Sequence, residues 1–270
     1  SFNCLWQFLL AERKMKMRMV VLYFSGTGNS KFIARHFAKK MGAECHSIEE
    51  KIDFKQLFDL VDTVAVVYPI YGSCVPRIMR EFVALYMEEF QKKKLIIFCT
   101  QMVFSGDGAK AFARLIPNCE EHILYAEHFK MPNNICNFPL FPMIRIGLGI
   151  KPRRALKRLD TVCNNIRNGV IKKRGWSIFS SLLGKTQNVG YPKIEEKARH
   201  SFHADDTCTK CGLCVRICPM NNLEIVNGQV IQKDNCTICY RCVNACPKQA
   251  ATVFLKAKPK RQYKGFQKNT

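Results

Sequence analysis

The sequence predicts an α/β protein in which a doubly wound parallel sheet of five strands is followed by a small α+β domain. Two observations lead to this prediction. Apolar runs of strand length alternate with helical patterns from Met19 to about Tyr125, as in a parallel sheet covered by helices on both faces. From Asp205 the composition then shifts sharply to cysteine, which indicates a second domain.

The strands of the sheet are predicted from short apolar runs. These runs lie at residues 19–24, 45–48, 64–68, 95–99 and 123–125. Between them, apolar residues such as Ile33, Phe37 and Met41 recur with the helical period. A last helix over residues 151–170 has one apolar side and would complete a sandwich of five strands and five helices.

Composition also divides the chain into segments. We expect an N-terminal extension (1–18), the α/β domain (19–174) with an insertion at 127–150, a linker (175–204), the cysteine-rich domain (205–256) and a basic, disordered tail (257–270). Residues 1–18 make a poor signal peptide because their basic residues follow the apolar part. We interpret them as sequence upstream of a start at Met15, Met17 or Met19, or as an ordered helix.

Two cysteine repeats are the most specific motif in the chain. The first is Cys208, Cys211, Cys214 and Cys218 before Pro219; the second is Cys236, Cys239, Cys242 and Cys246 before Pro247. This spacing is typical of two [4Fe-4S] clusters, in which the fourth cysteine of each repeat binds the other cluster. One predicted ligand set is therefore Cys208, Cys211, Cys214 and Cys246, and the other is Cys236, Cys239, Cys242 and Cys218.

Zinc binding is the alternative interpretation of these cysteines. Zinc sites often use two CxxC pairs, and nothing in zinc chemistry requires three cysteines at two-residue gaps followed by Cys-Pro, twice over. Thiolate ligands need a reducing compartment, so we expect a cytoplasmic protein. The repeats are joined by an expected hairpin that turns at Asn227-Gly228.

A loop rich in glycine and hydroxyl groups, Ser25–Ser30, follows the first strand and precedes a helix. Backbone N–H groups at a helix N-terminus favour a phosphate, although a simple helix cap would use the same residue types. In an open sheet of strand order 2-1-3-4-5, ligands bind at the carboxyl ends of strands 1 and 3. The loops that begin at Pro69 and Thr100 follow strands 3 and 4.

These three loops resemble those of the flavodoxin family, which implies a flavodoxin-like sheet of order 2-1-3-4-5 and bound FMN. The resemblance implies that the first loop binds the phosphate and the other two bind the isoalloxazine ring. The implied residues are Ser25, Gly26, Thr27, Gly28, Asn29, Ser30, Pro69, Ile70, Tyr71, Gly72, Thr100, Gln101, Met102, Phe104 and Gly106. Both tryptophans, Trp6 and Trp176, lie outside these loops, which leaves the stacking partner of the ring open.

Residues 203–255 resemble bacterial two-cluster ferredoxins. Nearly all of residues 19–255 together resembles a family of flavodoxin–ferredoxin fusion proteins of anaerobic microbes, which implies an electron-transfer protein. We expect electrons to pass between the two clusters and FMN. The alternatives are an FMN-dependent reductase of a small organic acceptor and a redox sensor. No catalytic acid or base stands out, so a carrier is favoured over a substrate-specific enzyme.

The chain is strongly basic, with 43 Lys and Arg residues, 21 Asp and Glu residues and a formal net charge of +22. Part of this charge is the run Lys151, Arg153, Arg154, Lys157, Arg158, Arg167, Lys172, Lys173 and Arg174, which contains one acid, Asp160. Such a run is usually a solvated helix face. It is also suited to an acidic redox partner of ferredoxin or flavodoxin type, or to a membrane surface, whereas nucleic acid is not expected.

Overall fold

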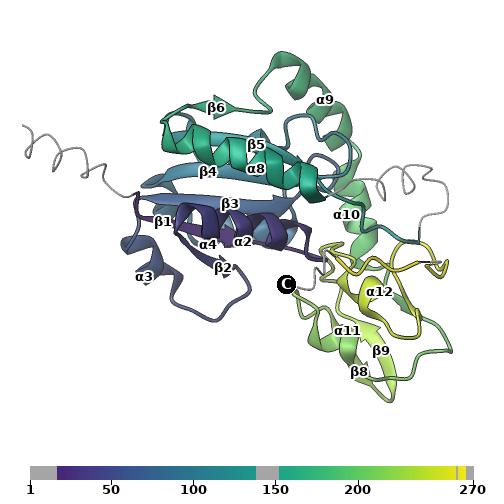
Figure 1. The fold of residues 1–270 in the computed structure, drawn as a ribbon. Helices are drawn as coiled ribbons and strands as arrows, with labels where there is room; N and C mark the ends of the chain where they lie inside the picture. Colours follow the sequence, from purple (N-terminus) through teal and green to yellow (C-terminus); the bar gives the residue numbers. More distant parts are fainter. Residues whose placement is uncertain (1–16, 138–151, 260, 266–270) are drawn as a thin grey trace, which may run out of the picture.

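The first domain is built on a parallel sheet of six strands in the order β2-β1-β3-β4-β5-β6 (Figure 1). The computed structural model describes residues 17–137, 152–259 and 261–265. The strands are β1 (Met19–Tyr23), β2 (Glu44–Ser47), β3 (Thr63–Pro69), β4 (Lys94–Gln101), β5 (Ile123–Lys130) and β6 (Lys172–Lys173). The predicted fold and strand order are confirmed. The extra strand, β6, has only two lysines and so gives no apolar strand signal.

Two layers of helices cover the sheet. On one face lie α2 (Asn29–Met41) and α8 (Pro152–Arg167); on the other lie α3 (Phe54–Asp59), α4 (Arg77–Leu85), α5 (Met87–Gln91) and α6 (Gly108–Ala113). A short 3-10 turn, Glu120–His122, precedes β5. Side chains alternate along each strand, so Val21 packs under α2 whereas Val20 and Leu22 face the other layer.

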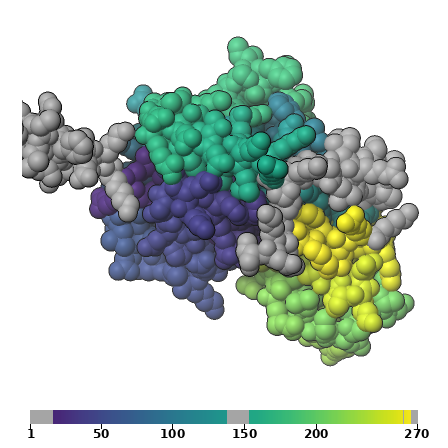
Figure 2. Space-filling model, in the orientation of Figure 1, coloured from purple at the N-terminus to yellow at the C-terminus, as the bar shows by residue number. Residues whose placement is uncertain are grey.

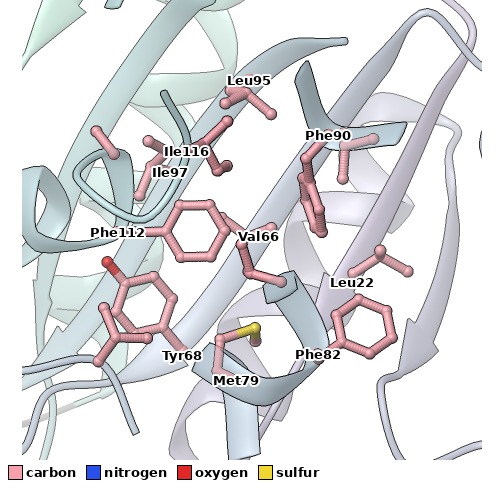
Figure 3. Close-up of a cluster of buried hydrophobic side chains, with 14 of the residues drawn as sticks. Leu22, Val66, Tyr68, Met79, Phe82, Phe90, Leu95, Ile97, Phe112 and Ile116 are labelled. Carbon is pink, nitrogen blue, oxygen red and sulfur yellow. The ribbon is translucent and has the colours of Figure 1, made fainter. Parts of the chain in front are cut away.

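The core between the sheet and α3–α6 is dominated by aromatic rings (Figure 3). Phe82, Phe90 and Phe112 come from three different helices and surround Val66 of the central strand β3. Phe90 and Phe112 meet edge to face, with ring centroids 5.9 Å apart. Truncation of one such buried ring costs about 3–5 kcal/mol. The sheet that carries the loops is therefore a rigid support.

The cysteine-rich domain lies beyond the carboxyl edge of the sheet (Figure 1). It contains β7 (His203–Ala204), α11 (Leu213–Arg216), β8 (Leu223–Val226), β9 (Gln229–Gln232), α12 (Arg241–Ala245) and β10 (Ala251–Thr252). Strands β8 and β9 pair antiparallel around the predicted turn, where Asn227 and Gly228 have φ angles of 49° and 72°. The hairpin is therefore present as predicted.

Three of the predicted segment assignments differ from the structure. Residues 175–204 are not a loose linker, because they form α9 (Ile178–Asn188), which Ser177 caps, and α10 (Tyr191–Arg199). The predicted insertion starts later than residue 127, since β5 continues to Lys130. The tail is not disordered at residues 261–265, where the Gln262 side chain and the Tyr263 N–H donate to the cysteine-rich domain. The extension 1–16 and residues 138–151 lie outside the described residues.

Among the helices that the structure describes, none has the length and apolar character to cross a membrane.

Candidate functional site

The three predicted loops meet at the carboxyl edge of the sheet. They follow β1, β3 and β4, which are neighbours in the sheet. The hydroxyls of Ser30 and Thr100 are 2.9 Å apart, and the N–H of Ile70 donates to the carbonyl of Thr100 at 2.9 Å. The structure therefore brings the three loops together into one platform.

The first loop has the features of an anion site. Gly28 has a φ of 102°, in the left-handed region that favours glycine, and its N–H donates to Ser25 Oγ at 3.1 Å. Among the side chains that the structure describes, none caps α2, and the first turn of this helix contains no acid. Within the described residues the hydroxyl of Thr27 is also without a hydrogen-bond partner. Because, among the described residues, the N-terminus of α2 lacks a side-chain cap and the Thr27 hydroxyl lacks a partner, the loop fits a phosphate group.

Buried polar groups support the third loop. The N–H of Ala109 donates to His128 Nε2 at 3.1 Å, so the proton of the neutral ring is on Nδ1, which faces Ser105 Oγ at 3.3 Å. Burial lowers the pKa of His128 to about 4, with a further contribution from Arg174. The hydroxyl of Ser105 donates to Gln101 Oε1. Among described residues, Gln101 Nε2 is buried without a partner, which leaves one donor for a ligand at this loop.

The helices of residues 175–204 pack directly on the second and third loops. A Cβ on Gly106 would lie 2.6 Å from the backbone nitrogen of Gly184 in α9, and one on Gly72 would lie 2.5 Å from the ring of Tyr191 in α10. Ser73 donates to Gln187 of α9. These glycines are therefore needed for close packing, and α9 and α10 form one wall of the site.

Two cavities in the second domain are each lined by four cysteines. One is lined by Cys208, Cys211, Cys214 and Cys246, and we name it the distal cavity. The other is lined by Cys218, Cys236, Cys239 and Cys242, and we name it the proximal cavity. Each cavity combines three cysteines of one repeat with the fourth of the other. These are the same two groups as the predicted ligand sets.

The two cavities differ in burial. In the proximal cavity, burial raises the pKa of the Cys236 thiol to about 11 and that of Cys239 to about 12. In the distal cavity Cys211 is exposed, and its pKa is lowered, chiefly by the backbone N–H of Leu213. The cysteines in the described part of the chain are all free thiols, and no three His, Cys, Asp or Glu residues there are arranged to hold a single metal ion.

The proximal cavity touches the first loop. A Cβ on Gly26 would lie 2.4 Å from the carbonyl oxygen of Cys239, so only glycine allows this approach. Arg241 donates to the carbonyls of Ser25 at 2.9 Å and Gly26 at 3.1 Å, and to both carboxylate oxygens of Glu49 at 2.8 Å. A further bond reaches the carbonyl of Ile217 at 3.0 Å. Arg241 therefore ties the two domains together between the loop and the proximal cysteines.

The tail crosses from the distal cysteines to the first loop. Gln262 Nε2 donates to the carbonyls of Val243 at 2.9 Å and Cys246 at 2.6 Å. The hydroxyl of Tyr263 donates to Asn29 Oδ1 at 2.5 Å. Gly265 follows against Thr27, because a Cβ there would lie 2.7 Å from the Thr27 carbonyl. Residues 262–265 thus form a strap over the first loop.

Several of these residues carry no clear signal in the sequence. Nothing in the cysteine spacing requires a basic residue at Arg241, Tyr263 lies outside every motif, and their partners in the first loop are more than 200 positions away. The basic run is also not one solvated face, because Arg158 and Arg174 bond the buried carboxylate of Glu127. Tyr71 is half-buried against the cysteine-rich domain, and Phe104 is 39% exposed beside Phe179. Helix α9 had one usable signal, the serine cap at Ser177.

Comparison with known proteins agrees with this division into two parts. A flavodoxin domain model matches residues 20–138, and a 4Fe-4S dicluster domain model matches residues 207–250. No curated protein matches the chain.

Several solved structures are similar to the first domain. A flavodoxin, WrbA-like protein from Agrobacterium tumefaciens is 16% identical with a TM-score of 0.37, and the match covers 54% of this chain and 98% of that one. A flavoprotein in complex with FMN from Lactobacillus acidophilus NCFM is 10% identical with a TM-score of 0.33, covering 42% and 93%. Rubredoxin oxygen:oxidoreductase from the anaerobe Desulfovibrio gigas is 13% identical with a TM-score of 0.41, covering 57% and 36%.

The sheet order, the loops at its carboxyl edge and the paired cysteine repeats agree with the two domain models. The chain is therefore a flavodoxin–ferredoxin fusion, in which a flavodoxin domain precedes a 4Fe-4S dicluster domain.

Proposed function

We propose that this protein transfers electrons between two [4Fe-4S] clusters, one in each cysteine-lined cavity, and an FMN held by the three loops. The contact between Cys239 and Gly26 is the observation that carries the proposal, because it brings a predicted cluster ligand against the predicted phosphate loop. Clusters exchange single electrons, whereas a flavin accepts and releases either one or two. Joining clusters and flavin in one chain is suited to electron transfer between them.

The residues have separate roles in this proposal. Ser25–Ser30 bind the phosphate with backbone N–H and hydroxyl groups, and Pro69–Gly72 and Thr100–Gly106 hold the ring. The unused Gln101 amide supplies a donor, and α9 and α10 exclude water from the ring loops. The thiolate ligands need a reducing compartment, which supports a cytoplasmic location.

Anaerobic purification followed by iron, sulfide and flavin analysis tests the cofactors. We expect about eight irons, about eight sulfides and one FMN per chain. Reductive titration should then bleach the absorbance of the clusters and of the flavin in the same protein. A chain that contains zinc at the cysteines, or that binds no flavin when FMN is supplied, would contradict the proposal.

An FMN-dependent reductase of a small organic acceptor is the second candidate. Exposed apolar side chains gather near the third loop, where Phe104 lies 6.5 Å from Phe179, measured between ring centroids. Such a surface would suit an apolar acceptor lying over the ring. Steady turnover with a quinone, nitroaromatic or enoate would favour this candidate, and its absence from a fully loaded protein would leave the electron carrier.

A further inference from the structure

The two faces of the sheet differ strongly in charge. Helices α2 and α8 carry the basic residues Lys31, Arg35, Lys39, Lys40, Arg153, Arg154, Lys157, Arg158 and Arg167, and one acid, Asp160. Helices α3–α6 on the opposite face balance Lys55, Arg77, Arg80 and Lys110 with Asp59, Glu81, Glu88 and Glu89. The positive charge is therefore concentrated on one side of the flavodoxin domain.

Most of this charge is not neutralised within the protein. Arg158 bonds the buried Glu127, and Lys40 pairs with Asp160 at 2.5 Å. Among described residues, the others make no ion pair, and Lys31, Arg35, Lys39, Arg153, Arg154, Lys157 and Arg167 are exposed. We call the exposed side of α2 and α8 the basic face. It remains positive after its internal pairs are counted.

The basic face is one continuous surface next to the candidate cofactor site. Helices α2 and α8 lie side by side in the fold and in the space-filling view, although they are over a hundred residues apart in sequence (Figure 2). Each connects two parallel strands, so both begin at the carboxyl edge of the sheet. Helix α2 starts directly from the first loop at Asn29. The N-terminal end of the basic face therefore lies beside the phosphate loop.

The composition of this face favours an acidic protein over a lipid surface. None of the exposed large apolar side chains of the described chain belongs to α2 or α8; several lie instead on α9, such as Ile178 and Phe179. A membrane-binding surface normally adds inserted apolar residues to its basic ones. Opposite charges on two proteins, in contrast, steer their encounter without an apolar patch.

We propose that the basic face is the docking surface for an acidic one-electron carrier protein. This inference rests on the proposed electron-transfer function and names its partner. Each productive encounter moves one electron between the carrier and the bound cofactors, so one is oxidised as the other is reduced. Docking beside the first loop keeps that exchange close to the flavin.

Charge reversal on the two faces tests the surface. The variant Lys39→Glu, Arg154→Glu, Lys157→Glu changes three exposed residues that lie outside the three loops and the cysteine repeats. The control Lys55→Glu, Lys92→Glu, Lys94→Glu makes the same charge change at exposed positions away from the basic face. Binding of a purified acidic flavodoxin is measured by calorimetry at about 50 mM and about 300 mM salt, since screening should weaken docking.

We expect the basic-face variant to weaken binding about 10-fold or more at low salt and the control to weaken it much less. Equal loss in both variants, or no salt-sensitive binding by the wild type, would overturn the inference. Phosphatidylserine vesicles and a short DNA duplex serve as competing probes, and binding to either without binding to the flavodoxin also overturns it. Iron and FMN content and dithionite titration of the same samples test the proposed function separately, because they need no partner.

Discussion

The proximal and distal cavities arise from almost identical cysteine repeats but lie in different surroundings. Each draws three cysteines from one repeat and one from the other. The proximal cavity is packed against the flavodoxin domain, where Cys239 joins the hydrophobic core of that domain. The distal cavity contains the exposed Cys211. The spacing of ligands therefore indicates which cluster type is expected, whereas the surrounding structure decides what each site does.

This difference suggests an order of electron transfer within the protein. A site against the first loop is placed for exchange with the flavin, whereas a site with an exposed cysteine is open to solvent and farther from that loop. Burial in low-dielectric surroundings and hydrogen bonds to sulfur also tune cluster potentials. The two sites should therefore differ in redox behaviour as well as in role.

The largest expected effect is the loss of one cluster, and it separates the two sites. Cys239→Ser should leave about four irons per chain and strongly slow flavin reduction, because the site beside the loop is lost. Cys211→Ser should also leave about four irons, but the remaining cluster still touches the first loop. Iron analysis and stopped-flow absorbance of the flavin measure both effects.

Comparing the two variants separates the effect of losing a particular cluster from the effect of losing any cluster. Equal iron loss in the two proteins shows that each has lost one cluster. Equal rates of flavin reduction would then contradict the distinction between a proximal and a distal site. Loss of all iron in either variant would show that the two clusters are assembled as one unit.

Arg241 gives the next largest effect, since it joins the proximal site to the flavodoxin domain. Arg241→Gln removes charge-assisted bonds to Glu49 and leaves the carbonyls of Ser25 and Gly26 without their donor. We expect a loss of about 1.5–3 kcal/mol in the free energy of unfolding, the range for hydrogen bonds to charged groups. Urea denaturation measures it, with cluster content as a second readout.

Arg18→Gln is the control for that measurement. Arg18 forms a similar pair with Asp62, but both side chains are exposed at the opposite edge of the sheet. Exposed pairs contribute little, so this variant should unfold close to the wild type. An equal loss in both variants would show that Arg241 has no special role at the domain contact.

The fold could be predicted from the sequence because its signals are local. The alternation of apolar strands and helices predicted the parallel sheet, the resemblance of its loops to flavodoxins implied the strand order, and the turn residues Asn227 and Gly228 predicted the hairpin. The cysteine spacing gave the same two groups of four that line the cavities. Local patterns of this kind depend on neighbours a few residues away.

The contact between the domains could not be predicted, because it depends on residues distant in sequence. Arg241 meets Ser25 across 216 positions, and nothing in the repeat around it requires a basic residue. Helices α9 and α10 were also missed, and in α9 the buried residue is Gly184, which fits against the third loop. Glycine usually signals flexibility, so tertiary packing here overrides the local signal.

The smallest expected effect concerns the strap, which links the distal cysteines to the first loop. Tyr263→Phe removes the hydroxyl that donates to Asn29, while Gln262 keeps its bonds beside Cys246. One hydrogen bond of this kind contributes about 0.5–1.5 kcal/mol, so FMN affinity should fall about 2- to 10-fold. Fluorescence titration of the flavin-free protein measures the change. Tyr86→Phe is the matched control, because the Tyr86 hydroxyl makes no side-chain hydrogen bond within the described residues. An unchanged affinity for Tyr263→Phe would mean that the strap holds only the cysteine-rich domain, and that the distal site has no structural link to the flavin loop.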